Sequence, residues 1–154
     1  MTSMISCASW ASRASRSLHE QRPHASRGLW PLALRLLELV RLRCSAVNGC
    51  DFCIAMHRKK AREAGLSAAE VVAIQSLGEE PIFCRDERLI LELCDAVTRL
   101  ADAQALRGVV DALQRSIGAL QTVEVLYAIA QINAWNRLAI AGGLGGLVES
   151  DLVP

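Results

Sequence analysis

Residues 38–65, ELVRLRCSAVNGCDFCIAMHRKKAREAG, carry the end of one apolar pattern and, after a polar interruption, the start of another. Asn48 belongs to the residue types that cap helix N-termini, and Gly65 to those that end helices. Basic side chains crowd the turns before Gly65, where the negative end of a helix dipole favours them. The pattern therefore predicts a helix over residues 48–65.

Further helical patterns fill the chain on both sides of this stretch. Ser67 and Glu70 have the spacing of a capping box, and Asp86 and Thr122 can cap two later helices. Pro31 suits the first turn of the helix that precedes residue 48. No convincing strand is found, and the predicted helices cover residues 30–47, 48–65, 67–78, 85–102, 103–116 and 122–143.

The composition supports the same fold class. The chain has 154 residues, of which 52% are hydrophobic and only 4% aromatic, so it can fill a core but lacks the residues that strands recruit. The prediction is an all-α bundle of five to six helices. Residues 1–28 differ in being rich in Ser and Arg without an apolar period, which predicts a loosely ordered arm before a helical domain over 29–154.

The predicted last helix is unusually apolar. Hydrophobic residues from Val123 to Ile140 occupy most of its circumference, which suits central burial or a subunit interface. We therefore expect a homo-oligomer.

Charge and hydropathy exclude several partners. The net charge is +1, so no overall field favours nucleic acid or a membrane surface. No uncharged apolar run is long enough for a transmembrane helix. Six cysteines are present, but a chain this long and apolar does not need a disulfide framework, and no secretory segment precedes it. The expected location is the cytoplasm.

The sequence NGCDFCIAMH (48–57) holds the residues with chemical potential. On a helix, Cys50, Cys53 and His57 lie on one face. In the first turn the dipole favours a thiolate at Cys50, and His57 can accept a thiol proton. A zinc site is an alternative, with Glu38 or Cys44 as the fourth ligand. A structural role is another alternative, because buried cysteines act as small hydrophobes.

With the upstream glutamate added, the stretch resembles the core of the AhpD-like alkylhydroperoxidases of the carboxymuconolactone decarboxylase superfamily. Their signature is a Glu, eleven residues, then CxxCxxxH, and Glu38, Cys50, Cys53 and His57 match it. The segment INAWNRLAIA (132–141) resembles the last helix of the family. The resemblance covers about residues 29–142.

The resemblance implies an all-α fold assembled as trimers or hexamers and a thiol-dependent peroxidase or disulfide reductase that serves antioxidant defence. Cys53 is implied to attack an organic hydroperoxide and to become a sulfenic acid, which Cys50 resolves to a disulfide. Glu38 and His57 are implied to relay the proton. No bound cofactor is implied, but an external dithiol, such as a dihydrolipoyl group on a partner protein, reduces the disulfide. An exposed Cys50 would suit this encounter.

One residue departs from the family pattern, and two alternative functions remain. Some members have a His where this chain has Phe52, so peroxidase activity is expected to be weaker or directed at another oxidant, whereas disulfide reductase chemistry would survive. One alternative is a decarboxylase on the same fold, which needs no redox CxxC. The other is a non-enzymatic oligomeric protein, for instance one that binds zinc.

The remaining candidates receive structural interpretations. Arg35 and Arg41 flank Glu38 at helical spacing and could pair with it, although such pairs contribute only about 0.2–0.5 kcal/mol. Cys44 and Cys94 lie in apolar helical contexts and are interpreted as core residues. Four residues of the last predicted helix are interpreted as helix contacts: Asn133, Trp135, Asn136 and Arg137.

Overall fold

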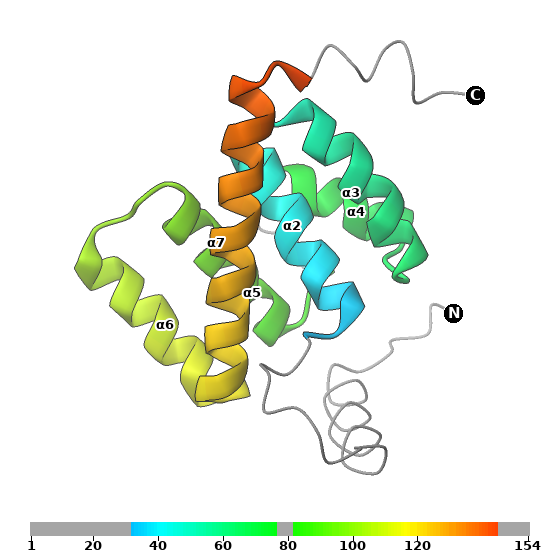
Figure 1. The fold of residues 1–154 in the computed structure, drawn as a ribbon. Helices are drawn as coiled ribbons and strands as arrows, with labels where there is room; N and C mark the ends of the chain where they lie inside the picture. The colour runs from blue at the N-terminus through cyan, green and yellow to red at the C-terminus, as the bar shows by residue number, and fades with distance from the viewer. Residues whose placement is uncertain (1–31, 77–81, 145–154) are drawn as a thin grey trace, which may run out of the picture.

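The computed structural model describes residues 32–76 and 82–144. Within these ranges the chain is all-α, as predicted, and Figure 1 shows its helices packed around a common centre. The helices are α2 (Leu34–Asn48), α3 (Asp51–Glu63), α4 (Ala68–Ser76), α5 (Arg85–Thr98), α6 (Ala103–Ile117) and α7 (Ala119–Ala141).

Helix α2 is the centre of the bundle. It packs against α3, α4, α5 and α7, while α6 packs against α5 and α7 (Figure 1). This position follows from its sequence, because Leu36, Leu39, Val40 and Leu42 place apolar side chains on several of its faces, and all four are buried. Burying one such side chain contributes about 1.5–3 kcal/mol.

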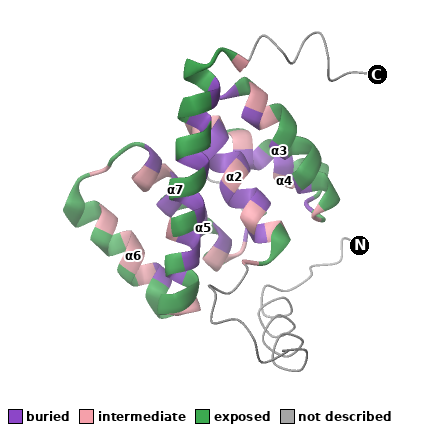
Figure 2. Ribbon diagram, viewed as in Figure 1, coloured by how far each residue is buried: buried purple, intermediate pink, exposed green. Residues whose placement is uncertain are grey.

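The core gathers where α2, α5 and α7 face one another, as Figure 2 shows. Branched aliphatic side chains from most helices fill it. Its largest fully buried members are Leu39, Leu42, Leu66, Ile74, Ile90, Leu93, Leu113 and Ile129.

Two arginines of α2 cross-link the bundle through carboxylates. The guanidinium of Arg43 donates to both oxygens of Asp95 on α5, at 2.6 and 2.8 Å. Arg35 donates to Glu70 at 2.6 Å and to Glu87 at 3.0 Å. The bidentate geometry at Asp95 sets the rotation of α5 against α2.

The helix ends match the sequence prediction in some places and not in others. The capping box is confirmed, because Ser67 Oγ accepts from the amide of Glu70 and the Glu70 carboxylate accepts from the amide of Ser67. The predicted Asp86 cap is wrong, since α5 begins at Arg85 and its N-cap is Cys84, two residues before Asp86. The Asp86 carboxylate instead accepts a hydrogen bond from Ser116 of α6.

The predicted start of the last helix is also wrong. Helix α7 begins at Ala119, so Thr122 lies inside its first turn rather than at its cap. Gly118, with a φ of 93°, ends α6 and leads directly into α7. The Thr122 hydroxyl donates to the carbonyl of Gly118 at 2.8 Å, a bond within the helix rather than a cap.

Some sequence predictions fall outside the described residues, namely the arm over 1–28, the Pro31 position and the last residues of the 67–78 segment. Among the described helices, none is both long enough and apolar enough to cross a membrane.

Candidate active site

The turn between α2 and α3 positions the two cysteines. Gly49 adopts the left-handed conformation, with φ 65° and ψ 35°, and ends α2. Its amide donates to the carbonyl of Ala46, and the amide of Cys50 donates to that of Ser45, which is the Schellman arrangement. Asn48 was predicted to cap α3, and this is wrong: it is the last residue of α2, and Cys50 is the cap.

Cys50 and Cys53 stand at the N-terminus of α3 and are joined by a disulfide, with their Cα atoms 5.2 Å apart. The amide of Cys53 also points at Cys50 Sγ, at 3.4 Å. Unpaired amides at a helix N-terminus stabilise negative charge, so a thiolate on Cys50 would be favoured here. The expectation of an exposed Cys50 is wrong, because only 2% of its surface is accessible.

Glu38 and His57 meet across the α2–α3 interface. His57 Nδ1 and Glu38 Oε2 are 2.7 Å apart, and both residues are buried. The other carboxylate oxygen of Glu38 accepts from Arg41 Nη1 at 2.8 Å. The family resemblance implied that these groups act together with the cysteines. In the structure, Glu38 bonds to His57, which lies one helical turn after Cys53 on α3, and Cys53 is bonded to Cys50.

The electrostatics of Glu38 favour its charged form. Burial acts to raise the pKa of this carboxyl, but the hydrogen bonds from His57 and Arg41 and their charges outweigh it and hold the pKa below its ordinary value. An ionised Glu38 orients the imidazole and stabilises it when it takes up a proton. Arg35 and Arg41 were both expected to pair with Glu38. Arg41 does so, whereas Arg35 pairs with Glu70.

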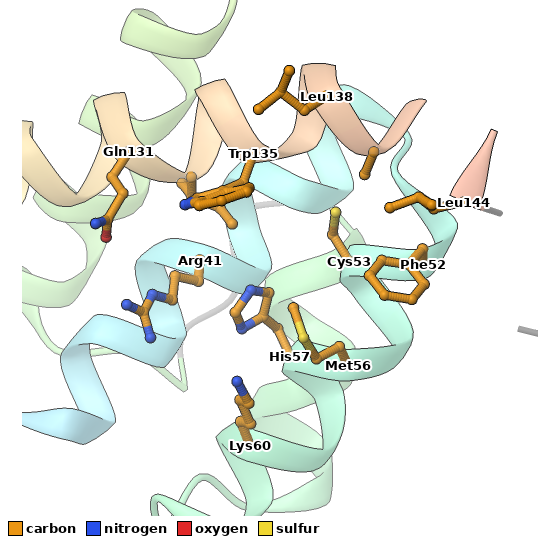
Figure 3. Close-up of a pocket in the computed structure, with 12 residues that line it drawn as sticks. Arg41, Phe52, Cys53, Met56, His57, Lys60, Gln131, Trp135, Leu138 and Leu144 are labelled. Carbon is orange, nitrogen blue, oxygen red and sulfur yellow. The ribbon is translucent and has the colours of Figure 1, made fainter. Parts of the chain in front are cut away.

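A cavity of about 420 Å³ opens beside these groups (Figure 3). Cys53 and His57 both line it, one helical turn apart on α3, whereas Cys50 is buried and does not line it. Phe52 contributes an apolar wall next to Cys53, and Arg41 and Lys60 lie toward the opposite end in Figure 3. The cavity thus offers one sulfur of the pair, together with a histidine, to an incoming molecule.

Helix α7 supplies the other wall of the cavity. Ala139 packs against the two cysteines, and the indole of Trp135 faces the cavity (Figure 3). Amide side chains hold this helix in place: Asn133 accepts from Asn48 at 2.8 Å, and Asn136 accepts from Ser45 at 3.2 Å. The interpretation of the two asparagines as helix contacts agrees with these bonds, while Trp135 belongs to the cavity.

The other described cysteines have separate surroundings. Cys44 and Cys94 are buried free thiols in the core, as interpreted from the sequence, and burial raises the pKa of Cys94. Cys84 is disulfide-bonded, which the sequence interpretation did not expect. In the described part of the chain, no group of three His, Cys, Asp or Glu side chains is arranged to hold a metal ion.

Sequence reasoning missed several cavity residues. Met56 and Lys60 follow Cys53 by three and seven residues, so helical spacing could have predicted that they share its face of α3. Gln131 and Trp135 gave no such signal, because they reach the cavity only through the packing of α7 on α3.

Comparison with known proteins agrees with this architecture. Residues 24–85 match the carboxymuconolactone decarboxylase family model. The chain is 31% identical over 106 residues to the uncharacterized protein YdfG of Bacillus subtilis (strain 168), covering 69% of this chain and 72% of that one. It also resembles a crystal structure from Agrobacterium tumefaciens, a protein of unknown function described as a candidate antioxidant defence protein AhpD. That match has a TM-score of 0.66 at 30% identity and covers 86% of this chain and 82% of the other.

The signature residues, the helical bundle and these similarities agree, and the chain therefore belongs to the carboxymuconolactone decarboxylase family, with an AhpD-like fold.

Proposed function

We propose that this protein is a thiol-dependent peroxidase that also acts as a disulfide reductase, in antioxidant defence. The observation that carries the proposal is the position of Cys53. Its sulfur lines a cavity beside His57, which Glu38 orients, and it is already within bonding distance of a second cysteine. A nucleophile, a base, an orienting group and a resolving thiol are the parts that this chemistry needs.

In the reduced protein, His57 accepts the thiol proton of Cys53, and ionised Glu38 stabilises the resulting imidazolium. The Cys53 thiolate then attacks the terminal oxygen of a hydroperoxide. The O–O bond breaks, an S–O bond forms, and the leaving alkoxide takes the proton from His57 to become an alcohol. Sulfur is oxidised to a sulfenic acid while the peroxide is reduced.

Cys50 completes the oxidative half. Its sulfur attacks the sulfenic acid, the S–O bond breaks, and hydroxide leaves with the Cys50 proton as water. The product is the Cys50–Cys53 disulfide, which is the state of the pair in the structure.

The reductive half requires an external dithiol and no bound cofactor. A donor thiolate attacks Cys53, the sulfur that lines the cavity, and Cys50 leaves as a thiolate. The amides at the start of α3 stabilise that leaving group, and a lower leaving-group pKa speeds exchange. The second donor thiol then releases Cys53 and leaves the donor as a disulfide. A dihydrolipoyl group on a partner protein has this chemistry.

The rest of the proposal concerns the setting. We infer a homo-oligomer, because apolar residues remain exposed along α7 (Figure 2). The family resemblance implies a trimer or hexamer, and we propose a cytoplasmic location. A disulfide reductase without strong peroxidase activity is the second candidate. Phe52 favours it, since an apolar side chain beside Cys53 cannot relay a proton.

The experiment is a turnover assay with cumene hydroperoxide and dihydrolipoamide. The parent should consume hydroperoxide, and Cys53→Ser should consume none. Cys44→Ser is the matched control, because it removes a buried thiol outside the cavity. If hydroperoxide is not consumed but a small-molecule disulfide is reduced, the disulfide reductase is the correct function. A decarboxylase activity measured separately, on a lactone acid, that persists in Cys50→Ser/Cys53→Ser would indicate decarboxylase-type chemistry instead.

A further inference from the structure

The cavity is chemically polarised. Its lining includes the two cations Arg41 and Lys60 and, among the described residues, no carboxylate. Figure 3 places both cations on the far side of His57 from Phe52 and Leu144. A molecule that fills this cavity would therefore contact positive charge at one end and hydrocarbon at the other.

Lys60 is the cation that is free to bind a ligand. Arg41 already gives one Nη to Glu38, whereas Lys60 has no ion pair with any residue in the described ranges. Lys60 follows His57 by three residues and Cys53 by seven, so all three share a face of α3. At 1.5 Å per residue, the rise along the helix from Cys53 to Lys60 is about 10 Å.

The apolar end suits an alkyl chain rather than a small polar peroxide. Phe52, Leu138 and Leu144 line it, and Met56 lies between them and the cations. Phe52 and Leu144 also pack against the cysteine pair, so this wall extends to the reacting sulfur. Hydrocarbon buried here gains about 25 cal/mol per Å² removed from water.

We propose that the substrate is an amphipathic anion, an alkyl hydroperoxide that carries a carboxylate several carbons from the peroxide, and that Lys60 selects it by pairing with the carboxylate. This rests on the proposed function, whose chemical step is unchanged: the O–O bond of the bound hydroperoxide breaks and Cys53 gains the terminal oxygen. Lys60 takes no part in that step and is a specificity residue.

The test compares ω-hydroperoxydecanoate with its methyl ester, which differ in charge but have nearly the same hydrocarbon. Steady-state rates are measured for the parent, Lys60→Gln and Lys60→Arg. Lys59→Gln is the matched control, since it removes the same charge from the neighbouring position, which does not line the cavity.

For the parent, the acid should have a kcat/KM about two- to fivefold above that of the ester, as expected for one exposed ion pair. Lys60→Gln should remove this preference by raising KM for the acid, and Lys60→Arg should restore it. Lys59→Gln should keep it. The preference should also shrink as salt is added.

Equal kcat/KM for acid and ester in the parent, or an equal loss in Lys59→Gln and Lys60→Gln, would overturn the selection by Lys60 while leaving the peroxidase intact. Failure to consume either hydroperoxide would instead overturn the proposed function.

A second measurement needs no turnover. Decanoate should protect reduced Cys53 from iodoacetamide better than decanamide does, in the parent but not in Lys60→Gln. Equal protection by the two compounds would contradict a carboxylate site at Lys60, whatever the peroxidase assay shows.

Discussion

At the scale of single residues, Glu38 is the group on which the site depends. It is buried to within 1% of its surface, yet both of its oxygens have partners, one on His57 and one on Arg41. A buried carboxylate is tolerated only with such partners, because an unpaired buried charge is very costly.

The lowered pKa of Glu38 predicts a pH dependence of stability. The folded carboxyl holds its proton less tightly than the unfolded one, so the unfolded state binds more protons. The contribution of ionised Glu38 to the free energy of unfolding is therefore fully present above the ordinary pKa of 4.5, and it is lost as the pH falls below that value. Urea unfolding of the oxidised protein across this range measures it.

Glu38→Gln should lower the free energy of unfolding at pH 7 by about 2 kcal/mol, because hydrogen bonds to a charged group are lost. The substitution should also make the free energy of unfolding depend less on pH in the acid range. Glu63→Gln, at an exposed position near the end of α3, is the control. An acid dependence in Glu38→Gln as steep as in the parent would show that another group is responsible.

The role of His57 predicts a loss of thiol reactivity. In His57→Gln, the reaction of reduced Cys53 with hydroperoxide should slow by about 100-fold, the scale of one general base. Stopped-flow measurements on the reduced protein would show this, with Arg58→Gln as the control on the exposed side of α3. A rate in His57→Gln within twofold of the parent would remove the histidine from the mechanism.

At the scale of elements, the turn at Gly49 determines where the cysteine pair lies. Its left-handed conformation ends α2 and makes the next residue, Cys50, the cap of α3. A Cβ at this position would meet no atom within 4 Å, so only the backbone conformation disfavours a side chain there.

Gly49→Ala should therefore destabilise the protein by about 1 kcal/mol. Gly108→Ala is the matched control, because it should change the free energy of unfolding in the opposite direction. Gly108 lies inside α6 with similarly open space around it, and Gly108→Ala should stabilise by about 0.5–1 kcal/mol. Thermal or urea unfolding measures both changes. Equal effects of the two substitutions would contradict the account of the turn.

The helices themselves were predictable from the sequence, but several of their ends were not. Apolar periodicity is a local property, so the helix interiors follow from it. Caps depend on what else a polar side chain can reach. Asp86 bonds to Ser116 on another helix and Thr122 to the carbonyl of Gly118, so neither serves as the predicted cap.

At the scale of the whole molecule, the site was predictable only in part. The motif residues lie on α2 and α3, which are adjacent in sequence. Helical spacing predicted that Cys53 and His57 share a face of α3, and the family resemblance implied that Glu38 acts with them. The cavity wall from α7 depends on long-range packing, which no local pattern indicates. The burial of Cys50 under Ala139 is a consequence of that packing.

Exposed apolar residues on α7 predict self-association. Leu120, Val123 and Tyr127 follow helical spacing, lie on its accessible surface and do not line the cavity. Val123→Asp/Tyr127→Asp should convert the proposed trimer or hexamer to monomers in sedimentation experiments, without loss of helical circular dichroism.

Val72→Asp is the control, because Val72 is an exposed apolar residue on α4, outside this surface. A parent that sediments as a monomer, or an unchanged mass in the double variant, would contradict an interface on α7.

The central claim is that Cys53 is the sulfur oxidised by hydroperoxide. Its most direct test is mass spectrometry of reduced Cys50→Ser and reduced Cys53→Ser after one equivalent of hydroperoxide and trapping with dimedone. We expect a sulfenic acid adduct on Cys53 in Cys50→Ser and no comparable adduct on Cys50 in Cys53→Ser. An adduct on Cys50 alone, or none on either cysteine, would contradict it.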